Sequence, residues 1–104
     1  MSLDAIFSAL ADPTRRQVVE TLLAEGETSV PRLTGTLPMS RQAVAKHLAA
    51  LDEAGLVKRS PGQGREVLYA LRPGALSPAT DWLARTEAAW DGRLGRLKDV
   101  VERG

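Results

Sequence analysis

The segment from Arg41 to Ala54 most constrains what this chain can fold into, because it contains neither proline nor glycine and has a helix boundary at each end. Ser40 can cap a helix at the start of the segment, and Gly55 can end it. Apolar residues recur within it at i, i+4 and i+7, which is the spacing of one buried helix face. The expected buried face comprises Val44, Leu48 and Leu51. We therefore predict a helix over 41–54 whose buried face is made by these three residues.

The opposite side of this helix is polar or carries small side chains, as a helix that lies in a groove requires. A shorter helix is predicted to precede it, capped by Ser29, with Pro31 in its first turn and Leu33 facing inward. Gly35 and Pro38 limit the length of this shorter helix. The chain should therefore place two helices in succession, joined by a tight turn.

Beyond Gly55 the apolar period changes from about four to two, which indicates a β-hairpin. Residues 56–59 are predicted to form one strand and residues 66–71 the returning strand, with a turn over 61–64 between them. Arg65 is expected at the base of the hairpin tip. Two strands alone are marginally stable in water, so the hairpin must rest on the helices.

Three further helices are predicted outside this region. An apolar stripe runs along a short first helix over 3–10. Asp12 and Pro13 start a second helix that reaches about Glu25, with one face made by Val18, Val19, Leu22 and Leu23. The last helix should run from Pro78, preceded by Ser77 as its cap, to near Glu102. Its apolar stripe contains both tryptophans and is broad enough to require a partner.

The composition restricts the classes of function. The chain has no cysteine and a single histidine, His47, which excludes disulfides, thiolate chemistry and most structural zinc sites within one monomer. No targeting signal or membrane-spanning run is apparent, so the expected location is the cytoplasm. The net charge is only +1, but 41–65 contains five basic and two acidic residues. A mildly basic band on a nearly neutral body suits sequence-guided binding to DNA.

A short helix, a tight turn, a longer helix and a basic hairpin together are typical of a winged helix-turn-helix. In that arrangement, Arg41 can pair with guanine and Gln42 with adenine, each through two hydrogen bonds. Ser40 can both cap the helix and contact phosphate, while Lys46 and Arg65 can neutralise backbone charge. The candidate DNA-binding residues are Ser40, Arg41, Gln42, Ala45, Lys46, His47 and Arg65.

Two assignments within this set stay open at the sequence level. His47 lies at the edge of the buried stripe, so it is either a boundary residue of the core or a phosphate contact, and a metal ligand is much less favoured. Lys58 and Arg59 alternate along a strand, so only one of them is expected to face DNA.

Residues 5 to 71 strongly resemble the ArsR family of bacterial winged-helix repressors, through the runs ALADPTRRQVVETLL, LPMSRQAVAKHLAALDEAGLVKR and GREVLYAL. The resemblance implies a mainly α-helical fold with a small β-hairpin, and a homodimer built from the first and last helices. It also implies repression through an operator with two-fold symmetry. The dimerisation residues expected on this basis are Leu3, Ile6, Phe7, Leu10, Trp82, Leu83, Trp90, Leu94, Leu97 and Val101.

The chain departs from the family at the known metal-sensing positions. Metal-sensing members carry a cysteine motif on the helix before the turn, which here reads SVPRLTGTL, or histidines on the last helix, where this chain has none. The sequence is therefore more similar to the metal-independent branch, without cofactor. The identity of any small-molecule inducer is open.

The predicted organisation is one domain over 1–104. It has dimerisation helices at 3–12 and 78–102, a helix-turn-helix at 29–54 and a wing at 56–71. The leading function is a sequence-specific DNA-binding repressor. The alternative is a winged-helix protein-interaction module that does not bind DNA. An enzyme is the weakest hypothesis, since the sequence shows no nucleophile beside a base, no phosphate-binding glycine loop and no clustered carboxylates.

Overall fold

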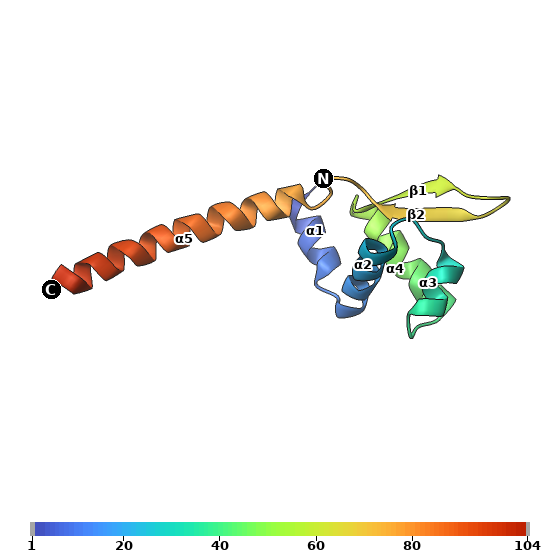
Figure 1. Cartoon of the computed structure of the whole chain (residues 1–104), viewed down its shortest axis with the longest axis horizontal. Helices are drawn as coiled ribbons and strands as arrows, with labels where there is room; N and C mark the ends of the chain where they lie inside the picture. The colour runs from blue at the N-terminus through green and yellow to red at the C-terminus, as the bar shows by residue number, and fades with distance from the viewer. Residues whose placement is uncertain (1, 104) are drawn as a thin grey trace.

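Five helices and one antiparallel hairpin follow one another in the predicted order, as the computed structural model of residues 2–103 shows (Figure 1). Met1 and Gly104, the ends of the predicted domain, lie outside the described residues. The elements are α1 (Leu3–Leu10), α2 (Pro13–Glu25), α3 (Val30–Thr36), α4 (Arg41–Glu53), β1 (Val57–Pro61), β2 (Val67–Leu71) and α5 (Ser77–Arg103).

The starts of α2, α3 and α4 form as the sequence predicts, because short polar side chains satisfy the free amides of each first turn. The Asp12 carboxylate accepts hydrogen bonds from the amides of Thr14 and Arg15 at 2.8 and 3.3 Å. Ser29 caps α3 and Ser40 caps α4 in the same way. Helix α2 ends at Gly26, whose φ of 74° is accessible to glycine at little cost.

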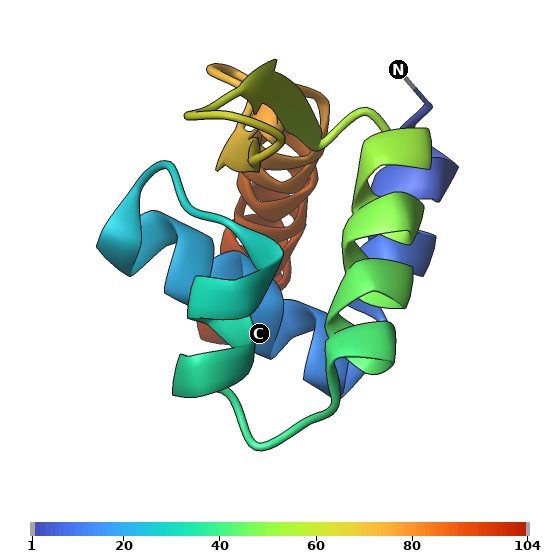
Figure 2. The ribbon, with the colours of Figure 1, turned by 90° about the vertical axis from the view of Figure 1, so that its right-hand side faces the viewer.

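The core forms where α1, α2, α3 and α4 pack together beneath the hairpin (Figure 2). The predicted inward face of α4 is confirmed, since Val44, Leu48 and Leu51 are completely buried. Each such side chain contributes about 1.5–3 kcal/mol by leaving water. The largest fully buried apolar side chains are Ile6, Val18, Leu22, Leu33, Val44, Leu48, Leu51, Leu56 and Val57. This core holds α4 on the body by one side only.

Two apolar residues differ from expectation. Leu23 continues the periodic face of α2 but is 66% exposed, although the adjacent Leu22 is buried in the core. Ile6 was expected at a dimer interface, but it is fully buried within its own chain. The prediction for Ile6 is therefore wrong, since it is a core residue of the monomer.

The hairpin pairs Val57 with Leu71 and Pro61 with Val67. Each strand begins one residue later than predicted. Leu56 lies before β1 and is buried, and Pro61 ends the strand instead of opening the turn. Arg65 lies within the turn that joins the strands, not at its base. Thr28 forms a bridge with Tyr69, which ties the hairpin to the loop before α3.

Helix α5 leaves the body and extends far beyond it (Figure 1). The chain measures 71 × 25 × 21 Å with a radius of gyration of 18.9 Å, whereas a compact chain of this length has about 13 Å. The helix begins at Ser77 itself, so the predicted role of Ser77 as a cap before it is wrong. Between residues 2 and 103, no helix combines the length and apolar character needed to cross a membrane.

Candidate DNA interface

The outward face of α4 is exposed along its first two turns. Helix α3 packs beside α4, as Figure 2 shows, and the core holds the other side. Arg41 and Gln42, in the first turn of α4, are exposed, as are Ala45 and Lys46 one turn later. The predicted readout residues therefore lie together on one polar, accessible strip along a rigid helix.

The first turn of α4 is held in place by its own cap. The Ser40 Oγ accepts a hydrogen bond from the Ala43 amide at 3.1 Å, and the Ser40 carbonyl accepts one from Val44 at 3.0 Å. Arg41 and Gln42 follow directly, so their backbone is fixed while their side chains remain free to reach outward. The helix N-terminus also concentrates positive partial charge, which favours nearby phosphate.

The wing is tied to α4 by an ion pair that the sequence did not reveal. The Arg59 Nε lies 3.4 Å from the Asp52 Oδ2, which joins β1 to the last turn of α4. Lys58 is exposed on the next position of the strand and forms no salt bridge within residues 2–103. Arg65 is also exposed, in the turn of the wing. Lys58 and Arg65 are thus the wing cations available to an external anion.

Comparison with known proteins gives a consistent result. A model of the helix-turn-helix domain family matches residues 10–60. The arsenical resistance operon repressor of Escherichia coli (strain K12) is 38% identical over 97 residues, covering 92% of this chain and 79% of the repressor. The structure of an ArsR-like transcriptional regulator from Rhodococcus sp. RHA1 superposes with a TM-score of 0.80 at 39% identity, covering 94% of this chain and 91% of the other.

The chain belongs to the ArsR family. Its fold is the winged helix-turn-helix of that family, and it is a DNA-binding transcriptional regulator, not an enzyme. A further structure, the homodimeric winged helix-turn-helix DNA-binding domain of a possible ArsR-family transcriptional regulator from Mycobacterium bovis, has a TM-score of 0.62 at 25% identity, over 86% of this chain and 78% of the other. Family membership decides against the protein-interaction module that the sequence left open.

His47 stands apart from the other candidate residues of this ArsR-family chain. It is half-buried, and its Nδ1 is buried without a hydrogen-bond partner within the described residues. The pKa of the nearby Asp12 carboxyl is lowered mainly by the hydrogen bond from the Arg15 amide, and His47 makes a smaller contribution. His47 therefore lies at the edge of the α4 surface and contacts the body.

The apolar face expected to join two ArsR-family subunits is accessible over most of its length. Phe7 packs against Trp82, and beyond that contact α5 has no partner within residues 2–103. Leu3 and Leu10 are partly buried against the core. The large apolar side chains that remain exposed along α5 are Trp82, Leu83, Trp90, Leu94, Leu97, Val100 and Val101.

No cluster of three or more histidine, cysteine, aspartate or glutamate residues with metal-binding geometry occurs in the described chain, residues 2–103. Helix α3 presents valine, proline, arginine, leucine, threonine and glycine at its seven positions. Neither thiolate nor imidazole is available there as a metal ligand.

Proposed function

We propose that this ArsR-family chain is a repressor that binds a two-fold symmetric operator as a homodimer, reading bases with the start of α4. The exposed strip of α4 carries this proposal, because its inner side is locked by fully buried Val44, Leu48 and Leu51. A helix fixed in this way can enter the major groove without rearrangement of the body.

Two residues at the start of the strip are assigned to base recognition. Arg41 and Gln42 are exposed and have the donor and acceptor groups for two-pronged contacts with guanine and adenine. Each such contact discriminates against the wrong base by about 1–3 kcal/mol. Ala45 is small and exposed one turn later, so it allows close approach of the helix and can contact a thymine methyl group.

The remaining residues are assigned to positioning on the phosphate backbone. Ser40 lies at the helix N-terminus, and Lys46 and Arg65 add positive charge on the helix and the wing. Lys58 joins this group in preference to Arg59, because Arg59 is engaged with Asp52. His47 is placed at the rim, where its exposed part can reach a phosphate.

The homodimer is supported by the unpartnered apolar face of α5. Six large apolar residues from Leu83 onward are 45–75% exposed on a helix that leaves the body. Burying such a face against a second copy removes it from water and sets two reading helices at a fixed separation. The homodimeric state described for the Mycobacterium bovis relative supports the same arrangement.

Selection of bound fragments from a random DNA pool tests the proposal directly. We expect enrichment of an inverted repeat whose half-sites are about one helical turn, 10–10.5 base pairs, or a multiple of it apart. Enrichment of single half-sites, or of no sequence, would contradict the proposed symmetric operator. A parallel selection with a chelator should recover the same repeat, since we propose that binding is independent of metal.

A further inference from the structure

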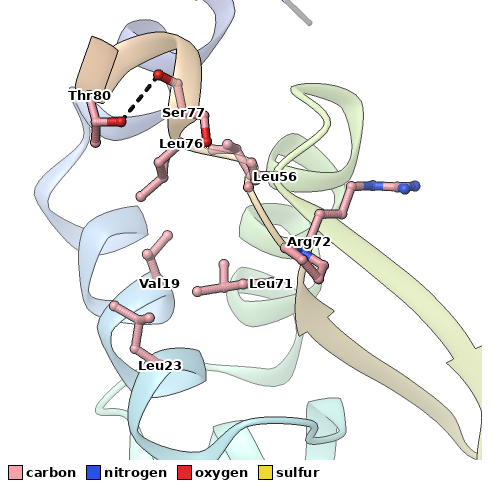
Figure 3. Close-up of a pocket in the computed structure, with 11 residues that line it drawn as sticks. Val19, Leu23, Leu56, Leu71, Arg72, Leu76, Ser77 and Thr80 are labelled. Carbon is pink, nitrogen blue, oxygen red and sulfur yellow. Dashed lines mark hydrogen bonds between the residues drawn. The ribbon is translucent and has the colours of Figure 1, made fainter.

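An apolar pocket of about 350 Å³ lies where α2, the base of the hairpin and the start of α5 meet (Figure 3). Its volume falls in the range of small-molecule sites, which is about 300–1,000 Å³. The large aliphatic side chains that line it are Val19, Leu23, Leu56, Leu71 and Leu76. They come from segments far apart in the sequence, so the pocket exists only in the folded chain.

The lining offers no charge to an occupant. Arg72 is the one charged residue among the described residues that line the pocket, and its Nε donates to the Val57 carbonyl at 3.1 Å. Figure 3 shows its guanidinium directed away from the leucine side chains. Ser77 and Thr80 place hydroxyl groups on the α5 side, where the Thr80 Oγ1 donates to the Ser77 carbonyl. This chemistry suits a neutral, mainly apolar molecule with one hydrogen-bonding group.

Leu23 supplies a reason for the pocket to be filled. It is 66% exposed, although the periodicity of α2 places it on the buried face. A molecule bound in the pocket would cover this side chain and remove its apolar surface from water. A partner protein is a poorer fit, because a stable protein interface needs about 800 Å² on each side and this pocket is a local hollow.

The pocket also touches the three parts of the chain that must be aligned for DNA binding. Leu56 lies between the end of α4 and the start of β1, and its carbonyl accepts a hydrogen bond from the amide of Arg72 at the end of the wing. Ser77 and Thr80 belong to the first turn of α5, from which the proposed dimer helix extends. An occupant would therefore contact the body, the wing and the base of α5 at once.

We propose that this pocket is an effector site for a small, neutral, mainly apolar molecule, whose binding changes the affinity of the regulator for DNA. A ligand can shift affinity only if it binds two arrangements of the chain unequally. The shape of this pocket depends on the angle between α5 and the body, because its opposite walls belong to α2 and α5. Binding of the molecule would therefore favour one angle of α5 over another. The effect on DNA rests on the proposed function, whereas the binding event does not.

The binding event is tested on the full chain without DNA, by fluorescence titration with the neutral apolar probe N-phenyl-1-naphthylamine. We expect saturable binding, at least five-fold weaker in Leu23→Ser, which removes a wall, and in Thr80→Phe, which fills the space. Val67→Ser is the matched control, since it removes an exposed apolar side chain of the wing outside the pocket. An equal loss in Val67→Ser, or unchanged binding in Leu23→Ser, overturns the site.

Two further measurements separate the alternatives. Light scattering at saturating probe should give the same molar mass as without probe. If the probe binds only when the chains dissociate, a second copy of the chain occupies the pocket, and the proposal is overturned. Fluorescence anisotropy with the selected operator should show at least a three-fold change in affinity on probe saturation, absent in Thr80→Phe. An unchanged affinity at full occupancy overturns regulation. Failure to bind DNA both with and without probe, together with saturable probe binding, overturns the proposed function and leaves the pocket as a binding site.

Discussion

The ring of Phe7 meets the ring of Trp82 edge-on, with centroids 5.6 Å apart and planes inclined at 74°. The two residues come from α1 and from the start of α5, so the contact joins these two helices where α5 leaves the body. Both rings remain partly exposed, at 37% and 40%. The pair therefore both anchors α5 on its own body and begins the apolar face that we assign to the dimer.

We expect a double-mutant cycle of Phe7→Ala and Trp82→Ala to give a coupling free energy of about 0.5–1.5 kcal/mol in urea unfolding, because edge-to-face aromatic pairs contribute that much beyond area burial. Phe7→Ala combined with Val67→Ala is the control, since Val67 lies on the wing, and its effects should be additive. Additive effects in the Phe7 and Trp82 cycle would show that the contact does not hold α5.

A charged residue introduced on the exposed apolar face of α5 should disrupt the proposed dimer. Leu97→Asp should convert a dimer into a monomer at micromolar concentration, measured by light scattering, because a carboxylate cannot be buried without a partner. Ala88→Asp places the same charge on the opposite side of the helix, at 100° per residue, and should leave the dimer intact. A dimeric Leu97→Asp variant would contradict the proposed interface.

The predictable part of the fold was the part governed by local periodicity and capping. Val44, Leu48 and Leu51 repeat along one side of α4, and their burial follows because the core meets that side. Ile6 and Leu23 have equally regular spacing, yet Ile6 is in the core and Leu23 is exposed. Periodicity identifies an apolar face but cannot tell which element covers it, since that depends on tertiary packing.

The site shows the same division. The exposure of Arg41 and Gln42 follows from the helix period and the position of Ser40 as cap. The ion pair between Arg59 and Asp52 could not be predicted, because it depends on how the hairpin docks against α4. A strand pattern allows two faces, and the register together with the packing selects one.

Leu48 tests how strongly the core fixes the reading helix. Leu48→Ala should lower the free energy of unfolding by about 2–5 kcal/mol, because it leaves a cavity in the packed core around a fully buried side chain. Leu48→Met conserves volume and should cost less than about 1.5 kcal/mol. Urea unfolding measures both, and equal effects of the two variants would show that the site collapses or tolerates the cavity.

Asp12 gives a pH dependence with a defined sign. The amide of Arg15, followed by that of Thr14 and the charges of His47 and Arg15, lowers the pKa of Asp12 below its ordinary 3.8, against an opposing effect of burial. Since the folded pKa is the lower one, the ionised group stabilises the fold above 3.8, and this contribution is lost as the pH falls through the folded pKa.

Asp12→Asn isolates this effect, because asparagine can still cap α2 but carries no charge for the helix N-terminus. We expect the wild-type chain to be more stable than the variant near neutral pH, with the difference shrinking as the pH falls below the ordinary aspartate range. Urea unfolding across that range measures it. A difference that is independent of pH would show that the negative charge of Asp12 does not stabilise the fold.

Gln42 and Arg65 separate base reading from phosphate binding on the proposed interface. Gln42→Ala should relax the preference at one position of the operator by about 1–3 kcal/mol, with little change in the salt dependence of binding. Arg65→Ala should weaken binding to all sequences similarly and reduce the salt slope by about one, since a wing cation releases counterions without touching a base edge. Lys98→Ala, on exposed α5, is the matched charge control and should leave both quantities unchanged.

Anisotropy titrations on matched and mismatched operators at several salt concentrations measure all three variants. If Arg65→Ala altered base preference instead, the wing would insert into a groove and read sequence there, and the division of roles between α4 and the wing would have to be reversed.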